Sequence, residues 1–174
     1  TIKVLNDDMS GSDSQVLSGL NAVYSVRTQF GGVHVLSLSL GGAAVYNSNC
    51  DGLFPDFASV FSQFNTAGIP IFVASGNGGF IDGVSKPACL SSAISVGAVF
   101  DANVGVSEPF PPAFCTDSTT AADQITCYSN SGIPLDILAP SHDANTTIPG
   151  GGYTPSFGGT SAACPYAAGV AAQI

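Results

Sequence analysis

The sequence predicts an α/β fold with a mostly parallel central sheet. Short apolar segments alternate with longer amphipathic ones, and every long apolar stretch is interrupted by Gly, Pro, Ser or Asn. This alternation is typical of a parallel sheet whose strands are connected by helices. We expect residues 1–174 to form a single domain, because no internal repeat, linker or run of charge divides them.

The first half of the chain contains two predicted helices. Ser12 and Gln15 form a capping pair at the start of a helix over residues 12–30. A second helix is predicted over residues 53–66, where apolar side chains recur at helical spacing. The inner side of the first helix is expected to carry Val16, Leu17, Leu20, Val23, Tyr24 and Phe30. The predicted strands of this half occupy residues 2–5, 33–38 and 70–74.

The second half continues the alternation and ends in a third helix. Strands are predicted over residues 93–98 and 135–138, and residues 148–152 predict a hairpin-like return. Residues 161–174 predict a helix made almost wholly of small apolar residues. Because this helix has no polar face, we expect it to be buried.

Acidic residues outnumber basic residues by twelve to three, which gives a formal net charge of −9. This balance argues against nucleic acid and anionic membrane surfaces as partners. With 45% hydrophobic residues, a chain of this length can form the core of one domain. The interrupted apolar stretches predict no membrane-spanning segment.

Five cysteines predict two disulfide bonds and one free thiol in an oxidising compartment. Four paired cysteines allow three connectivities, and the sequence alone does not choose among them. Cys115 and Cys127 flank a polar loop, which favours a local pair, and Cys50 and Cys89 follow turns that we expect at one sheet edge. The alternative is a cytosolic protein with free thiols. Cys164, inside the last helix, is expected to be a small buried side chain rather than a nucleophile.

Ser161 is the strongest candidate for a functional residue. It lies between a glycine turn and the last predicted helix, where unpaired backbone N–H groups can hold a developing negative charge. Taken alone, a Gly-Thr-Ser turn is equally typical of a helix cap. The segment Gly-Thr-Ser-Ala-Ala-Cys-Pro at residues 159–165 resembles the nucleophile segment of the subtilisin-like serine proteases, the subtilases. The resemblance implies that Ser161 is a catalytic nucleophile.

A second block, residues 69–79, agrees with the first. It predicts a buried strand that ends in a glycine turn with one amide side chain, Asn77. The block resembles the subtilase segment whose asparagine donates a hydrogen bond to the oxyanion, and the resemblance implies a catalytic role for Asn77. The alternative is that Asn77 fills a left-handed turn position, which asparagine tolerates.

A third block, residues 33–42, runs from an apolar strand into Ser-Leu-Gly-Gly. Glycines let a second backbone approach closely, as in the pairing of an extended peptide with a strand. A parallel strand alone would be equally apolar. The block resembles the substrate-binding segment of subtilases. The resemblance implies a substrate-binding pocket with two walls, formed by Ser39, Leu40 and Gly41 and by Ala74, Ser75 and Gly76.

The resemblance covers essentially the whole chain and implies a three-layer subtilisin-like fold that is incomplete here. Subtilases use Asp, His and Ser in that chain order, and the resemblance places the Asp and His segments before residue 1. Neither His34 nor His142 is expected to replace that histidine. We therefore expect residues 1–174 to be the C-terminal part of a subtilase catalytic domain, accompanied by a second polypeptide that carries the catalytic Asp and His.

The resemblance, together with the cysteine content, implies a secreted serine endopeptidase that hydrolyses peptides or proteins through an acyl-enzyme on Ser161. The histidine and aspartate would come from a segment or chain outside these residues, so the chain alone is expected to be inactive. The alternative is a catalytically inactive subtilase-fold module for peptide binding or structure. No cofactor is expected. Subtilases often bind structural calcium, but no carboxylate cluster in this sequence has the spacing of calcium ligands.

Overall fold

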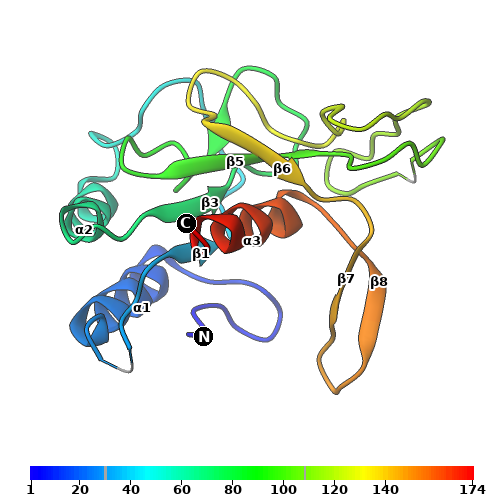
Figure 1. The fold of residues 1–174 in the computed structure, drawn as a ribbon. Helices are drawn as coiled ribbons and strands as arrows, with labels where there is room; N and C mark the ends of the chain where they lie inside the picture. Colours follow the sequence, from blue (N-terminus) through cyan, green and yellow to red (C-terminus); the bar gives the residue numbers. More distant parts are fainter. Residues whose placement is uncertain (30, 108) are drawn as a thin grey trace.

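The computed structural model describes residues 1–29, 31–107 and 109–174. A four-stranded parallel sheet forms the centre of the molecule (Figure 1). In spatial order its strands are β1 (Leu36–Leu38), β3 (Ile71–Ala74), β5 (Ile94–Val99) and β6 (Ile137–Pro140). The predicted α/β fold with a parallel central sheet is thus confirmed.

Helices cover both faces of this sheet. The helices α1 (Asp13–Val26) and α2 (Pro55–Thr66) share an apolar core with one face, and α3 (Thr160–Ala171) packs on the other. Strand β3 separates the two cores, because Val73 belongs to the first and Phe72 to the second. All four side chains of β3 are buried, as is typical of a parallel strand covered on both sides.

Helix α1 begins at the predicted capping pair. The Ser12 hydroxyl accepts a hydrogen bond from the backbone N–H of Gln15 (3.3 Å), and the backbone N–H of Ser12 donates to the Gln15 side chain (2.8 Å). The helix ends at Val26, short of the predicted end, because the chain turns at the C-cap residue Arg27. Phe30, which the prediction placed in this helix, lies outside the described residues.

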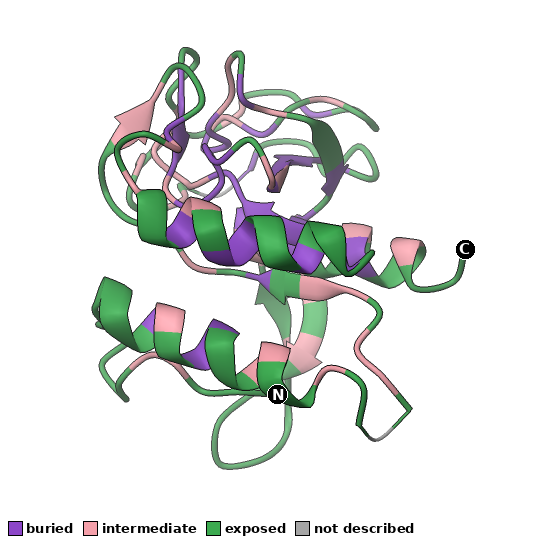
Figure 2. Ribbon diagram, turned by 90° about the vertical axis from the view of Figure 1, so that its left-hand side faces the viewer, coloured by how far each residue is buried: buried purple, intermediate pink, exposed green. Residues whose placement is uncertain are grey.

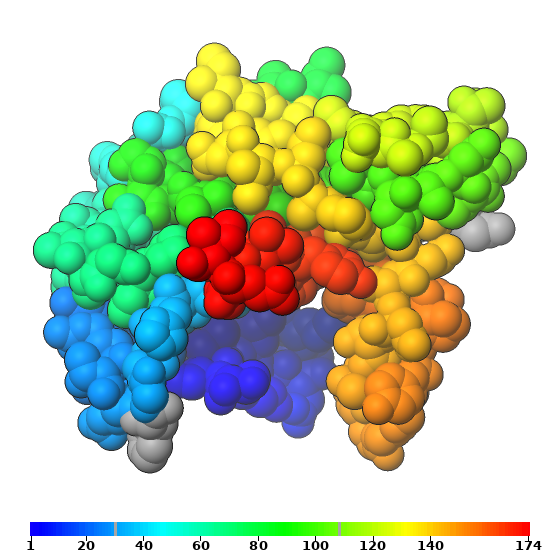
Figure 3. Space-filling model, in the orientation of Figure 1, coloured from blue at the N-terminus to red at the C-terminus, as the bar shows by residue number. Residues whose placement is uncertain are grey.

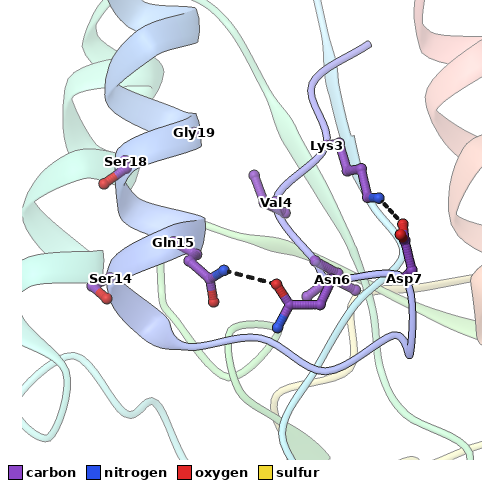
Figure 4. A pocket seen from close by; sticks show the side chains of 9 residues that line it. Lys3, Val4, Asn6, Asp7, Ser14, Gln15, Ser18 and Gly19 are labelled. Atoms are coloured by element: carbon purple, nitrogen blue, oxygen red, sulfur yellow. Dashed lines mark hydrogen bonds and ion pairs between the residues drawn. The ribbon is translucent and has the colours of Figure 1, made fainter.

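The predicted strand over residues 2–5 is wrong. This segment runs beside α1 (Figure 4), and Val4 lies so close to Gly19 that a Cβ on Gly19 would be 2.3 Å from it. The Gln15 side chain also donates a hydrogen bond to the Asn6 side chain (3.3 Å). Within the described part of the chain, no strand lies beside residues 2–5, and a strand needs a neighbour to pair its backbone groups.

Two antiparallel pairs complete the fold. The short strands β2 (Val45–Tyr46) and β4 (Val84–Ser85) pair beside the sheet. A hairpin of β7 (Ala144–Thr147) and β8 (Tyr153–Phe157) projects from the body of the molecule around the predicted return at residues 148–152 (Figure 1). The other predicted strands and α2 are present with boundaries shifted by a few residues.

Helix α3 differs from its prediction in bounds and in burial. It spans Thr160–Ala171 rather than residues 161–174. Its sheet-facing side is buried, with Cys164 at 0% exposure, whereas Tyr166 is 50% and Val170 61% exposed on the open side (Figure 2). The prediction of a buried helix is therefore wrong for this outer face. No described helix is long and apolar enough to cross a membrane.

Two disulfide bonds join Cys50 to Cys89 and Cys115 to Cys127, with Cα–Cα distances of 5.5 and 6.0 Å. These are the pairs that the sequence favoured. Cys164 is free and buried between α3 and the sheet. Burial raises the pKa of its thiol, although hydrogen bonds from Ser37 and its neighbours oppose this effect.

Alkylation with iodoacetamide should distinguish this thiol from the four bonded cysteines. On the denatured, unreduced chain we expect one alkylated cysteine, Cys164, located by peptide mass mapping. On the native protein the same site should react far more slowly, because the reactive thiolate is disfavoured by burial. Three or five alkylated cysteines under denaturing, non-reducing conditions would contradict the assigned pairs.

Candidate active site

The candidate site lies where the N-terminus of α3 meets the loops that follow β1 and β3. Parallel strands end at the same edge of a sheet, so these two loops are brought together there. A cleft of about 780 Å³ opens at this edge, and both Ser161 and Asn77 line it. The structure thus brings the two predicted catalytic residues to one cavity.

The side chain of Asn77 caps α3. Its Oδ1 accepts hydrogen bonds from the backbone N–H and from the hydroxyl of Thr160, both at 2.8 Å. The N-cap residue of α3, Gly159, has no side chain that could do this. It also has a φ of 82°, and a Cβ there would lie 2.9 Å from Asn77 Nδ2, so the close contact requires glycine.

This contact fixes which end of the Asn77 carboxamide is engaged by α3. Because Oδ1 is engaged by Thr160, Nδ2 is left to donate elsewhere. Within the described residues, Nδ2 donates to no protein group. The Thr160 hydroxyl also accepts a hydrogen bond from the backbone N–H of Gly76 (3.2 Å), which ties the β3 loop to α3 a second time.

Ser161 lies in the first turn of α3, where backbone N–H groups lack intrahelical partners. Neither its hydroxyl nor its backbone N–H makes a hydrogen bond within the described residues. Its carbonyl would normally accept from the residue four positions on, but that residue is Pro165, which has no N–H. Instead, the Ser39 hydroxyl donates to this carbonyl at 2.8 Å. Ser39 therefore connects the β1 loop to the turn that carries Ser161.

Most of the predicted wall residues also line the cleft. These are Ser39, Leu40, Gly41, Ala74 and Gly76. Ser75 lies behind the wall, because its side chain is fully buried and its hydroxyl donates to the carbonyl of Asn130 (2.9 Å).

Asn130 organises the loop after β3 and was not identified from the sequence. It is 1% exposed, and its side chain makes four hydrogen bonds. Its Oδ1 accepts from the backbone N–H groups of Gly78 (2.9 Å) and Phe80 (3.2 Å). Its Nδ2 donates to the Ser75 carbonyl (3.2 Å) and to the Ser85 hydroxyl (3.3 Å). All donors and acceptors of this amide are used.

Asn130 also explains a glycine in the same loop. Gly76 has a φ of 109°, and a Cβ there would lie 2.3 Å from Asn130 Nδ2. The loop that carries Asn77 therefore wraps around the Asn130 side chain. The sequence around Asn130 is an ordinary polar turn, so no local signal marks it.

The two histidines lie away from Ser161. His34 is exposed before β1, where its Nε2 lies 3.1 Å from the Gly31 carbonyl. His142 stacks edge-on against Phe100, with ring centroids 4.9 Å apart. No histidine lines the cleft in the described part of the chain. Those residues also contain no group of three or more His, Cys, Asp or Glu side chains placed to hold a metal ion.

Comparisons with known proteins agree with this geometry. The family model described as "Subtilase family", peptidase S8, matches residues 1–174. The chain belongs to the subtilase family. It is 34% identical over 177 residues to "Subtilisin-like protease 2" of Pseudogymnoascus destructans, covering 99% of this chain and 36% of that protein. It is 30% identical over 176 residues to "Subtilisin" of Bacillus pumilus, covering 99% of this chain and 52% of that protein.

Solved structures show the same fold. The chain superposes on the structure described as "Crystal structure of a cold adapted subtilisin-like serine proteinase" with a TM-score of 0.71 and 26% identity. The match covers 98% of this subtilase chain and 50% of that one. The chain thus spans between 36% and 52% of the length of the curated relatives and about half of the matched structure.

Replacing Asn130 by leucine tests whether the loop after β3 of this subtilase depends on the hydrogen bonds of Asn130. The substitution leaves the backbone N–H groups of Gly78 and Phe80 without their acceptor. We expect a loss of about 2–4 kcal/mol in the free energy of unfolding, measured by urea denaturation. The control is Asn145→Ala, an exposed position on β7, which should change stability by less than about 0.5 kcal/mol. Equal unfolding midpoints for Asn130→Leu and the control would show that the loop does not depend on Asn130.

Proposed function

We propose that this chain provides the nucleophile and the oxyanion donors of a serine endopeptidase. The observation that carries the proposal is the junction between Asn77 and the first turn of α3. Thr160 holds the Asn77 carboxamide by its oxygen, and Nδ2 and the Ser161 N–H are two unused donors on one cleft. The Ser161 hydroxyl is the nucleophile of this proposal, and Ser161 lines the same cleft as Asn77. Membership of the subtilase family supports the same assignment.

The proposed reaction begins with attack of Ser161 Oγ on the carbonyl carbon of a peptide bond. The carbonyl oxygen becomes negatively charged and accepts hydrogen bonds from Asn77 Nδ2 and from the Ser161 N–H. The positive end of the α3 dipole favours this charge. The general base returns the proton taken from Ser161 to the nitrogen, and the tetrahedral intermediate expels the neutral amine. An acyl group remains on Ser161, and water hydrolyses that ester.

The attack requires a general base, because a serine hydroxyl is a weak nucleophile at neutral pH. We propose that the histidine and its orienting aspartate come from residues outside these 174, on another segment or on a second polypeptide. No described histidine lines the cleft, and the outer face of α3 exposes Tyr166 and Val170. Figure 3 shows a hollow at this face, between the N-terminal residues and the β7–β8 hairpin.

The sheet supports the same proposal. Strand β1 is at the edge of the described sheet, with β3 on one side and no strand on the other. An open edge presents unpaired backbone groups, and an uncovered helix face leaves apolar surface in water. A strand between residues 2–5 and β1 would pair the open sheet edge, and a helix beside α3 would cover the exposed face of α3.

The substrate we propose is an extended peptide that pairs with the Ser39–Gly41 segment. Strand addition supplies main-chain hydrogen bonds without regard to side chains. The two disulfide bonds support secretion as the proposed location, because such bonds persist in oxidising compartments.

A fluorophosphonate probe tests the nucleophile. The chain combined with the segment that carries His and Asp, called here the complete catalytic unit, should be labelled at Ser161. Ser161→Ala should abolish labelling, and Asn77→Ala should lower kcat by about 10²–10³-fold, the magnitude of one oxyanion donor in proteases of this family. Asn145→Ala should label like wild type. Peptide binding without any labelling would favour the alternative, an inactive peptide-binding module.

Native mass spectrometry tests the source of the base. The 174-residue chain expressed alone should self-associate through its open face and edge, and it should not react with the probe. Co-expression with a polypeptide that supplies His and Asp should give one defined complex that is labelled. A soluble, monodisperse monomer of 17.4 kDa that folds alone would contradict the need for a partner.

A further inference from the structure

Lys86 is the one cationic side chain that lines the cleft within the described residues. The chain has only three basic residues. Lys3 pairs with Asp7 beside α1 (Figure 4), and Arg27 stacks over the Tyr24 ring. A positive charge in the cleft of such an acidic chain is therefore a distinct chemical feature of that cavity.

The ammonium group of Lys86 is held in place from several sides. Its side chain is 17% exposed, and Nζ donates a hydrogen bond to Asp13 Oδ2 at 2.5 Å. The same Nζ lies 4.5 Å from the ring centroid of Phe54 and 5.4 Å from that of Phe57. Opposite charge and aromatic faces offset the desolvation of a partly buried ammonium. An ammonium has three N–H donors, and Asp13 is the one acceptor that the described residues provide.

Asp13 is the more exposed partner of this pair, with 58% of its side chain accessible. It lies in the first turn of α1, where the helix N-terminus stabilises a carboxylate with or without Lys86. Asp13 can therefore share Lys86 with another carboxylate or release it without losing all of its stabilisation. In this ion pair, several contacts hold Lys86 in place, whereas Asp13 can change its hydrogen-bond partner.

The segment from Ser39 to Gly42 connects Lys86 to Ser161. At one end, the Ser39 hydroxyl donates to the Ser161 carbonyl; at the other, the backbone N–H of Gly42 donates to the Lys86 carbonyl (2.9 Å). Three residues of extended chain span about 10 Å. The hydrogen bond from Gly42 locates the Lys86 backbone, and the Lys86 side chain reaches Asp13, which lines the same cleft. A peptide paired antiparallel with the segment would thus pass Lys86 about three residues before the scissile bond.

We infer that Lys86 is a specificity-determining residue that selects peptides with Asp or Glu at the third or fourth position before the scissile bond. This inference rests on the proposed function, because it assumes that a peptide occupies the cleft. The substrate carboxylate accepts a hydrogen bond from the free N–H donors of Lys86, and Asp13 competes for the same ammonium. Lysine or arginine at that position is repelled by Lys86, and glutamine gains no charge-assisted hydrogen bond.

Peptide binding to the Ser161→Ala form of the complete catalytic unit tests this inference without turnover. Fluorescent peptides carry Glu or Gln at each of the four positions before the scissile bond, and fluorescence anisotropy gives the Kd of each pair. We expect Glu to bind about tenfold more tightly than Gln at the third or fourth position. The ratio should fall toward one as salt is raised, because part of the site is exposed.

Four substitutions test whether Lys86 causes the preference for Glu over Gln. Lys86→Met should bring the Glu/Gln ratio to about one, and Lys86→Arg should retain the preference. Asp13→Asn should increase the ratio, since the competing carboxylate is gone. Lys3→Met removes the other lysine that pairs with an aspartate, outside the cleft, and should leave the ratio unchanged. Urea unfolding of each variant checks that the fold is intact.

The experiments distinguish failure of the inferred Lys86 subsite from failure of the proposed endopeptidase reaction. A Glu/Gln ratio that is the same in Lys86→Met and wild type, or near one at every position in wild type, would overturn the inference. If the preference depends on Lys86 but the fluorophosphonate probe leaves Ser161 unlabelled, the subsite stands and the endopeptidase proposal fails. If Ser161 is labelled but the preference does not depend on Lys86, the endopeptidase proposal stands and the subsite inference fails.

Discussion

The contact between the Asn77 carboxamide and the first turn of α3 is the constraint on which the candidate site depends. A helix N-terminus needs acceptors for its free N–H groups, and Gly159 cannot provide one. Asn77 provides it from 83 residues away in the sequence, and it accepts from the Thr160 hydroxyl as well. The same bond that caps the helix therefore leaves Nδ2 as the free end of the carboxamide. Helix stability and donor orientation are properties of one interaction.

The loop that carries Asn77 is held in turn by a buried amide. Asn130 uses all of its hydrogen-bonding capacity on this loop and on Ser85, and Gly76 is required for the close approach. On the opposite side, the missing N–H of Pro165 leaves the Ser161 carbonyl to Ser39. These contacts hold Asn77 and Ser161 in place without a ligand, which is the condition for stabilising a developing charge in the reaction that we propose.

Helices cover the two faces of the central sheet to different extents. The face shared with α1 and α2 has a closed core that includes the Cys50–Cys89 disulfide, whereas α3 leaves one side open. The open side belongs to the helix whose first turn carries Ser161, and we propose that the general base lies on this side. At the other end of the cleft, the Asp13–Lys86 pair connects α1 to the segment after β4. We propose catalysis at one end of the cleft and selection of substrate by charge at the other.

The sequence by itself determined the features that depend on local patterns. Helix caps, apolar spacing and glycine turns predicted the parallel sheet, the three helices and the position of Ser161 at a helix start, and the cysteine positions favoured the observed pairs. Tertiary structure decided whatever depends on a distant partner. Residues 2–5 have strand-like side chains, but the described residues provide no strand to pair with them, and α3 has apolar residues on a face that nothing described covers. The hydrogen bonds of Asn130 and the ion pair of Lys86 join residues 45 to 73 positions apart. A polar side chain in a turn looks the same in sequence whether it faces water or a buried backbone, because its partners are set by how the chain folds back on itself.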